Sequence, residues 1–153
     1  RLLGQLGNCC IASGDGWYFT QSEREWQLIL YNYTHYDNIY RYRYRRLEHP
    51  EDAYSVFESG KVVRFQVTFP ALRRGLYQIE QQEITRTSGS SFDLWLAAGA
   101  PPSPDRAFLQ YLAEHASAHR PLTTEQVDTA LRLETTLQPL EVRLFRIRKM
   151  NFT

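Results

Sequence analysis

The chain has 153 residues, a length that ordinarily forms one domain, and roughly 70% of the unfolded surface can be buried at that size. Its 18 lysines and arginines nearly cancel 17 aspartates and glutamates. This balance excludes nucleic acid and anionic membranes as expected partners. The 10 tyrosines and 8 phenylalanines, set among short alternating runs with Thr, Val and Ile, favour strands over a helical bundle.

The first seven residues, RLLGQLG, are typical of the last turns of an amphipathic helix that ends at a glycine. We therefore expect residues 1–7 to be the tail of a preceding structure in a longer chain. The neighbours Cys9 and Cys10 offer too few ligands for a structural metal site, and we expect two small buried side chains. With no signal peptide or membrane span in the sequence, a cytoplasmic location fits best.

The strand candidates are separated by turn residues. Residues 14–16 (GDG) form a turn before a strand at 17–21, which can form a hairpin with residues 26–33. The segment 26–33 is apolar on both faces, as a central strand is. Further strands are predicted at 63–69, 75–84, 131–137 and 141–147, with the last two joined by a tight connection at 138–140.

After the central strand, tyrosines alternate with arginines from Tyr40 to Arg45. Two interpretations stay open: an edge strand with its tyrosines packed inward, or a loop whose aromatic side chains dock on a neighbouring domain. Aromatic faces also stack on sugars, and the candidate ligand-binding residues are Trp17, Tyr36, Tyr40 and Tyr42. The other two tryptophans, Trp26 and Trp95, are expected in the core.

Helical patterns are concentrated in the middle of the chain. Residues 105–118 have apolar positions on one side, with Ser103 as the cap, Pro104 in the first turn and Pro121 after the end. Shorter helices are predicted at 50–57 and 92–98. The predicted fold class is all-β, mainly an antiparallel β-sandwich over residues 8–150, with one or two short helices inserted in an excursion at 92–118. An edge-closed barrel is the alternative.

Two groups of carboxylates could in principle flank a sugar ring, as glycoside hydrolysis requires. Glu48, Glu51 and Asp52 lie next to Pro50, where acidic residues suit the start of a helix. Glu80 and Glu83 lie on a predicted strand, where charged side chains suit a solvated face. Neither group indicates catalysis.

Two histidines, His115 and His119, have the spacing that places both on one helix face, but no third ligand follows. The loop SGSS at 88–91 lacks the glycines and the lysine of a phosphate loop and the pattern of a nucleophile elbow. We therefore expect no catalytic residue, no metal and no cofactor in this chain.

A series of motifs runs through the chain in a fixed order: GDGWY (14–18), LYNY with HYD (30–37), EDAYSVF (51–57), GSSFDLW with GAP (89–101) and LQPLEVRL (137–144). In this order they resemble the region that follows the barrel in glycoside hydrolase family 39. That family contains β-xylosidases, and a similar region is found in long AraC-type transcription regulators with a xylosidase-like C-terminal half. The resemblance covers nearly the whole chain.

The resemblance implies a β-sandwich behind a (β/α)8 barrel that carries both catalytic glutamates, the acid/base one directly after an asparagine. This chain contains no Asn-Glu pair, so no catalytic residue is carried over. Residues 1–7 correspond to the tail of the last barrel helix. Ser88 departs from the family, which commonly has a histidine before the glycine, so any role of that histidine in fixing the loop is not carried over.

We therefore expect a non-catalytic accessory domain that packs on the barrel of a retaining xylan 1,4-β-xylosidase-type protein. The tyrosine segment, which we define as residues 36–45, and residues 88–104 would supply the contacts with the barrel and with a second subunit in a homo-oligomer. The alternative is a carbohydrate-binding or effector-sensing module of an AraC-type regulator, in which Trp17 and the tyrosines stack on a xylo-oligosaccharide. Neither expectation involves direct contact of this chain with nucleic acid or membrane.

Overall fold

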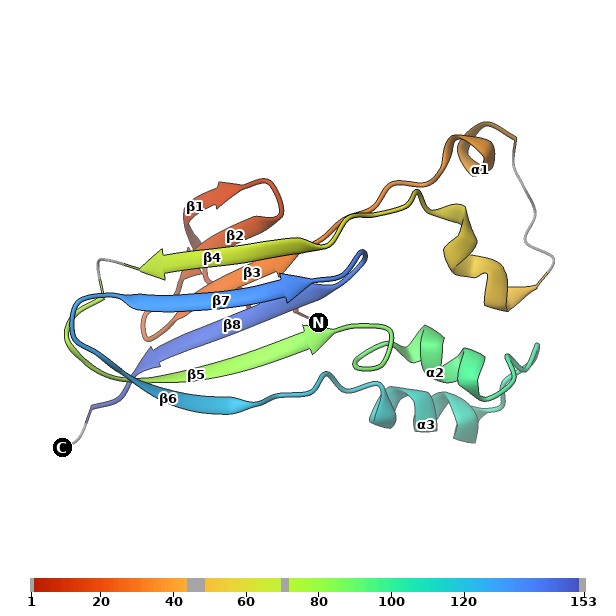
Figure 1. Cartoon of the computed structure of the whole chain (residues 1–153). Coiled ribbons are helices and arrows are strands. Elements are labelled where there is room, and N and C mark those ends of the chain that lie inside the picture. The colour runs from red at the N-terminus through yellow and green to blue at the C-terminus, as the bar shows by residue number, and fades with distance from the viewer. Residues whose placement is uncertain (1, 44–48, 70–71, 152–153) are drawn as a thin grey trace.

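The computed structural model describes residues 2–43, 49–69 and 72–151. Its strands are β1 (Cys9–Gly14), β2 (Trp17–Gln21), β3 (Trp26–Tyr31), β4 (Val63–Phe69), β5 (Gly75–Ile84), β6 (Leu122–Val127), β7 (Leu131–Leu137) and β8 (Val142–Lys149). They form a six-stranded sheet in the order β1-β2-β3-β8-β5-β6 and a two-stranded sheet of β4 and β7, and each pairing between them is antiparallel. Figure 1 shows the smaller sheet over the larger one. The predicted all-β, mainly antiparallel fold is confirmed.

The core lies between the two sheets. The side chains at its centre are almost fully buried and come from both sheets: Leu28, Leu30, Tyr77, Leu131, Leu137 and Ile147. On β4 the predicted period of two is observed, because Arg64, Gln66 and Thr68 are exposed while the residues between them face the core. This alternation fixes the register, since a slip of one residue would turn the apolar side chains of β4 to solvent.

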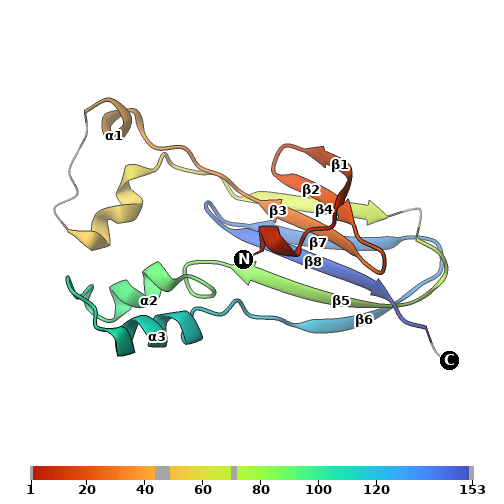
Figure 2. The same cartoon turned by 180° about the vertical axis from the view of Figure 1, so that it is seen from behind.

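The outer face of the six-stranded sheet carries a second, smaller apolar cluster. Leu2 packs there with Ile29 and Leu144, next to the 3₁₀ turn η1 (Leu3–Gln5). In Figure 2 this N-terminal segment lies in front of the larger sheet. The described residues 2–7 therefore hold a 3₁₀ turn, where the sequence suggests the last turns of an amphipathic helix.

Two edge strands were not predicted from the sequence. β1 is exposed along all six of its residues, and in β6 only Val127 is buried. Neither strand shows a buried face, so its sequence lacks the alternation that would identify it. Because Cys9 and Cys10 lie on β1, both are exposed free thiols, and the expectation that they are buried was wrong.

The tight connection at 138–140 is present, but it does not close a hairpin. β7 belongs to the small sheet and β8 to the large one, so this connection crosses between the two layers. The predicted hairpin through residues 22–25 does form, since β2 and β3 pair and the Ser22 N–H donates to the Glu25 carbonyl oxygen at 3.0 Å.

The helices lie in two excursions that leave the sandwich at the same end (Figure 1). The first connects β3 to β4 and carries α1 (Asn38–Arg43) and the 3₁₀ helix η2 (Pro50–Val56); the second connects β5 to β6 and carries α2 (Ser91–Ala97) and α3 (Arg106–His115). None of the described helices is long and apolar enough to cross a membrane.

Side-chain caps explain where these helices begin. The Asp37 carboxylate accepts a hydrogen bond from the Tyr40 N–H at the start of α1, so this part of the tyrosine segment is helical and is neither an edge strand nor a loop. Asp105 caps α3 by accepting from the Phe108 N–H at 2.8 Å, and Ser103 does not. α3 also ends at His115, before the predicted end at residue 118.

Candidate functional site

The two helical excursions are joined by a polar clasp, which we define as Tyr54, Arg86, Ser90 and Asp93. The Tyr54 hydroxyl, on η2, donates to the Asp93 carboxylate, on α2, at 2.6 Å. The Arg86 guanidinium lies 4.0 Å from the centre of the Tyr54 ring and 3.4 Å from an Asp93 oxygen. Ser90 caps α2 through the Asp93 N–H. Segments far apart in the sequence are thus held as one unit.

The charge states of the clasp suit a structural contact. Burial alone would raise the pKa of Asp93, but hydrogen bonds from Ser90, Tyr54 and Arg86 outweigh burial and hold that pKa below its ordinary range. Burial, with the hydrogen bond to Asp93, raises the pKa of Tyr54. At neutral pH the carboxylate is charged and the phenol is neutral. Neither group is poised to exchange a proton near pH 7.

Two of the predicted ligand-binding residues meet beside this end of the sandwich. The Tyr36 ring stacks on Phe57 at 4.9 Å and lies 5.1 Å from Tyr40, with both distances between ring centroids. Tyr36 is 47% exposed and Tyr40 is half-buried. Tyr42 lies in α1, and its side chain is outside the described residues, as is the whole of Tyr44.

Trp17, another of the predicted ligand-binding residues, lies elsewhere in the fold. Trp17 is half-buried on β2, packs against the sandwich core and lines an apolar cavity of about 390 Å³ together with Phe19, Phe65 and Phe69. Within the described residues no ring contact joins Trp17 to Tyr36 or Tyr40, so the structure does not assemble the predicted residues into a single aromatic platform.

The other two tryptophans differ from each other. Trp26 packs against the sandwich core, as expected, and its ring lies 6.2 Å from that of Tyr77. Trp95 is outside this core: it is half-buried on α2, beside the Phe92 ring, and its indole N–H donates to the Pro101 carbonyl oxygen at 3.1 Å. The expectation of a core position was therefore wrong for Trp95.

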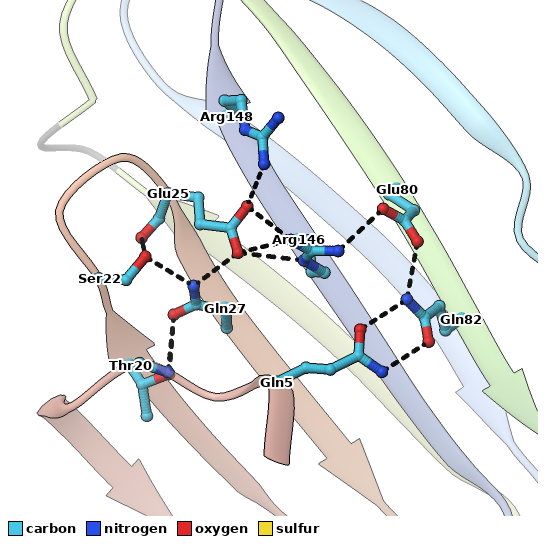
Figure 3. A network of polar contacts seen from close by, with 10 residues as sticks. Gln5, Thr20, Ser22, Glu25, Gln27, Glu80, Gln82, Arg146 and Arg148 are labelled. Atoms are coloured by element: carbon cyan, nitrogen blue, oxygen red, sulfur yellow. Dashed lines mark hydrogen bonds and ion pairs between the residues drawn. The ribbon is translucent and has the colours of Figure 1, made fainter. Parts of the chain in front are cut away.

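Three glutamates on or next to the large sheet are bound to arginines: Glu25, in the turn before β3, and Glu80 and Glu83, on β5. Glu25 accepts from Arg146 and Arg148 at 2.9 Å each, and Arg146 also reaches Glu80 at 3.3 Å (Figure 3). Glu83 pairs with Arg143 at 3.2 Å. These ion pairs leave each carboxylate with a cationic partner.

The pKa of Glu25 shows the effect of these partners. Burial would raise that pKa, but hydrogen bonds from Gln27, Arg146 and Arg148 outweigh burial and lower it. A glycosidase instead needs one carboxyl group that stays protonated near neutral pH. The remaining candidates, Glu51 and Asp52, lie in the first turn of η2, as expected for a helix start, while Glu48 is outside the described residues.

The two histidines do not share a helix face. His115 is the last residue of α3, and its ring stacks on Tyr111 at 4.1 Å. His119 lies beyond the helix, where its N–H donates to the Ser88 hydroxyl at 3.0 Å. Among the described residues no three His, Cys, Asp or Glu side chains gather as a metal site would require.

No protein-family description and no curated protein sequence matches the chain. Solved structures do. A monomeric β-xylosidase from Caulobacter crescentus has a TM-score of 0.65 and 12% identity over 91% of this chain and 27% of its own. A GH39 enzyme from Xanthomonas axonopodis pv. citri has a TM-score of 0.65 and 10% identity over 97% of this chain and 29% of its own. The chain has the fold of a region in family 39 glycoside hydrolases.

A bacterial orthologue of human α-L-iduronidase has the same fold, with a TM-score of 0.56 and 14% identity over 97% of this chain and 26% of its own. At these identities the similarity is one of fold. The chain spans less than a third of each of the three proteins.

Sequence reasoning missed the clasp between the excursions. Ser90 and Asp93 have the spacing of a capping box before an apolar run, which could have located the start of α2. The partner Tyr54 is 39 residues from Asp93 in the sequence, and no local pattern connects the two. The contact follows from both excursions leaving the same end of the sheets.

Proposed function

We propose that this chain is the accessory β-sandwich domain of a family 39-like glycoside hydrolase and packs on that protein's catalytic barrel. The main support is coverage: 91–97% of the chain superposes on only 27–29% of two solved family 39 proteins. The order of the sequence motifs adds to this support. The proposed parent is a retaining β-xylosidase-type protein.

A non-catalytic role for the domain is supported by the state of its carboxylates. Glu25, Glu80 and Glu83 each have an arginine partner, and Asp93 is bound within the clasp. Hydrolysis with retention needs two carboxyl groups about 5–5.5 Å apart across the sugar, one of them protonated. Because these carboxylates are held in ion pairs, none of them is available as the protonated acid or as the nucleophile.

The outer face of the six-stranded sheet is the surface that we assign to the barrel. A groove of about 390 Å³ lies there, lined mainly by apolar side chains that include Leu3, Ile29, Tyr33 and Val142. Leu3 is 72% exposed and Tyr33 is 63% exposed, which is unfavourable for apolar surface that has no partner. Residues 2–6 already pass over this face, so it is continuous with the N-terminal segment.

This assignment predicts a difference between the chain alone and its parent protein. In the isolated chain, we expect the double variant Leu3→Asp, Tyr33→Asp to change the free energy of unfolding by no more than about 0.5 kcal/mol, because both side chains are exposed there. In the parent the same pair should lower the stability by about 2 kcal/mol or more, since a charge would be buried at the contact. Denaturant unfolding of both proteins measures this.

The matched control is Ile11→Asp with Leu122→Asp, at two exposed apolar positions on β1 and β6, away from the groove. The control pair should affect the parent no more than it affects the chain. Equal effects of the two pairs in the parent would contradict the assignment of the outer face.

The tyrosine segment supplies a second contact in this proposal, to the barrel or to a second copy of the protein. The partly exposed Tyr36, stacked on Phe57 beside Tyr40, supports a contact role. A parent protein with Tyr40→Ser and Tyr42→Ser should lose stability or change its oligomeric state by ultracentrifugation. Unchanged stability and assembly would count against this contact.

The second candidate function is a carbohydrate-binding or effector-sensing module, as in an AraC-type regulator. The exposed face of Tyr36 favours it, because an exposed aromatic ring can stack on a sugar. Saturable binding of xylo-oligosaccharides to the chain, followed by its tryptophan fluorescence, would support a module. Absence of binding would support the accessory role.

A further inference from the structure

A polar groove lies between the loop after β5 and the C-terminal end of α3. Its volume is about 850 Å³, within the range of sites for small molecules. The residues that line it include apolar ones, Leu94, Ala97 and Ala118, and hydroxyl-bearing ones, Thr87, Ser88, Ser90 and Ser117. Such a mixture can contact both the C–H faces and the hydroxyls of a sugar ring.

Basic side chains outnumber acidic ones in this groove. The basic residues that line it are Arg86, His115, His119 and Arg120, against a single acid, Asp93. Because Arg86 is paired with Asp93, the positive charge of this groove comes from Arg120. An unpaired cation in a groove attracts anionic ligands.

The free cation of the groove is Arg120. Asp93 is already occupied, because it accepts hydrogen bonds from Tyr54, Ser90 and Arg86. Arg120, in contrast, is exposed and has no hydrogen bond or ion pair with any residue that the structure describes. Its guanidinium is therefore free to bind a carboxylate in the two-pronged manner of arginine.

The two sides of the groove are fixed to each other. The His119 N–H donates to the Ser88 hydroxyl at 3.0 Å, and the Ser88 carbonyl oxygen accepts from the Thr85 N–H at 2.8 Å. On α3, the His115 ring is held by stacking on Tyr111 at 4.1 Å. Groups held in place before binding lose less entropy when a ligand arrives.

We propose that this groove binds an acidic sugar, with Arg120 holding the carboxylate and the hydroxyls of Ser88 and Ser117 bonding to the ring hydroxyls. This inference gives the domain a ligand of its own and so goes beyond the accessory role. The choice of a sugar to carry the carboxylate rests on the proposed function. The volume also favours a sugar, because an inorganic anion would fill only a small part of 850 Å³.

Calorimetric titration of the 153-residue chain with three probes tests the proposal. The probes are a disaccharide of glucuronic acid and xylose, the neutral disaccharide xylobiose, and inorganic sulfate. We expect saturable binding of the acidic disaccharide, weakened by salt, and at least about tenfold weaker binding of the other two, since each lacks one set of contacts.

The variant Arg120→Ala should weaken binding of the acidic disaccharide about tenfold, because it removes a charge-assisted hydrogen bond. The matched control is Arg132→Ala on β7, another exposed arginine, which is not among the groove residues. We expect this control to bind as the original chain does. Circular dichroism of both variants establishes that they are folded.

Four results would overturn the proposal: no binding of the acidic disaccharide, equal binding of xylobiose, sulfate binding as tightly as the disaccharide (a simple anion site), or equal behaviour of the two variants. The barrel contact is measured separately by unfolding of the parent protein. A failure of sugar binding is therefore distinguishable from a failure of the accessory role.

Discussion

Asp93 joins two segments of the chain that are remote in sequence, through its bonds to Tyr54 and Arg86. Its side chain is only 12% exposed, so these bonds are largely shielded from water. We expect Asp93→Asn to lower the free energy of unfolding by about 1–3 kcal/mol, since hydrogen bonds to a charged group contribute that much. Urea denaturation of the chain measures the change.

The control for this prediction is Asp128→Asn. Asp128 pairs with Arg74 at 3.0 Å, but both side chains are more than 60% exposed. An ion pair in water contributes about 0–1 kcal/mol, so the loss should be small. If both variants lose the same stability, the clasp is no stronger than a surface pair.

The lowered pKa of Asp93 also predicts a dependence of stability on pH. A carboxyl group whose pKa is lower in the folded than in the unfolded state stabilises the fold above the unfolded value of about 4. That contribution is lost as pH falls through the folded pKa. The difference in stability between the original chain and Asp93→Asn should therefore shrink below about pH 4. A constant difference from pH 6 to pH 2, in urea midpoints, would contradict this.

Individual elements show what the sequence can and cannot predict. The strands that correspond to β2, β3, β4, β5, β7 and β8 were predicted because their side chains alternate or are buried on both faces. The edge strands β1 and β6 were missed because exposed edges need no apolar pattern. α1 was missed because alternating tyrosine and arginine suggested a period of two, while the cap Asp37 decided for a helix.

The candidate site was harder to predict than the fold. Trp17 was chosen because it follows a turn, and Tyr36, Tyr40 and Tyr42 because they belong to a run of tyrosines and arginines. The structure brings Tyr36 and Tyr40 together, away from Trp17. The groove at Arg120 was not predicted at all. Its lining comes from the start and the end of the excursion between β5 and β6, which the pairing of β5 with β6 and the packing of α2 on α3 bring together.

The position of η1 depends on a close approach of Gly7 to the sheet. The Gly7 N–H donates to the Thr20 hydroxyl at 3.0 Å and to the Gln27 side-chain oxygen at 3.1 Å. A Cβ at Gly7 would lie 2.2 Å from the Gln21 carbonyl oxygen, so the segment would have to shift. We expect Gly7→Ala to destabilise the chain by about 1–3 kcal/mol.

Gly4 provides the matched control, because a Cβ there meets nothing within 4 Å. Gly4→Ala should be neutral, or stabilising by about 0.4–1 kcal/mol through the lower entropy of the unfolded chain. Denaturant midpoints of both variants measure the two effects. Equal midpoints would mean that residues 2–7 do not hold their position on the sheet.

In the whole molecule, the two candidate contact surfaces lie at different places on the sandwich. The outer face of the large sheet carries apolar side chains around η1, and the end with the helices carries the basic groove and the exposed tyrosine. The polar network of Glu25, Arg146 and Glu80 ties the β2–β3 turn, β8 and β5 together on the outer face (Figure 3). These ion pairs link neighbouring parts of the sheet, and the surfaces available for contact lie beside the network.

This arrangement predicts that the chain alone does not hydrolyse glycosides. The two glutamates of β5 that could flank a sugar, Glu80 and Glu83, are already paired with arginines. We expect the 153-residue chain to release no nitrophenol from an aryl β-xyloside above the buffer rate, with an active β-xylosidase as the positive control. Release by the chain that disappears in Glu80→Gln or Glu83→Gln would show that these carboxylates are catalytic. Release that is equal in both variants and the original chain would come from neither carboxylate.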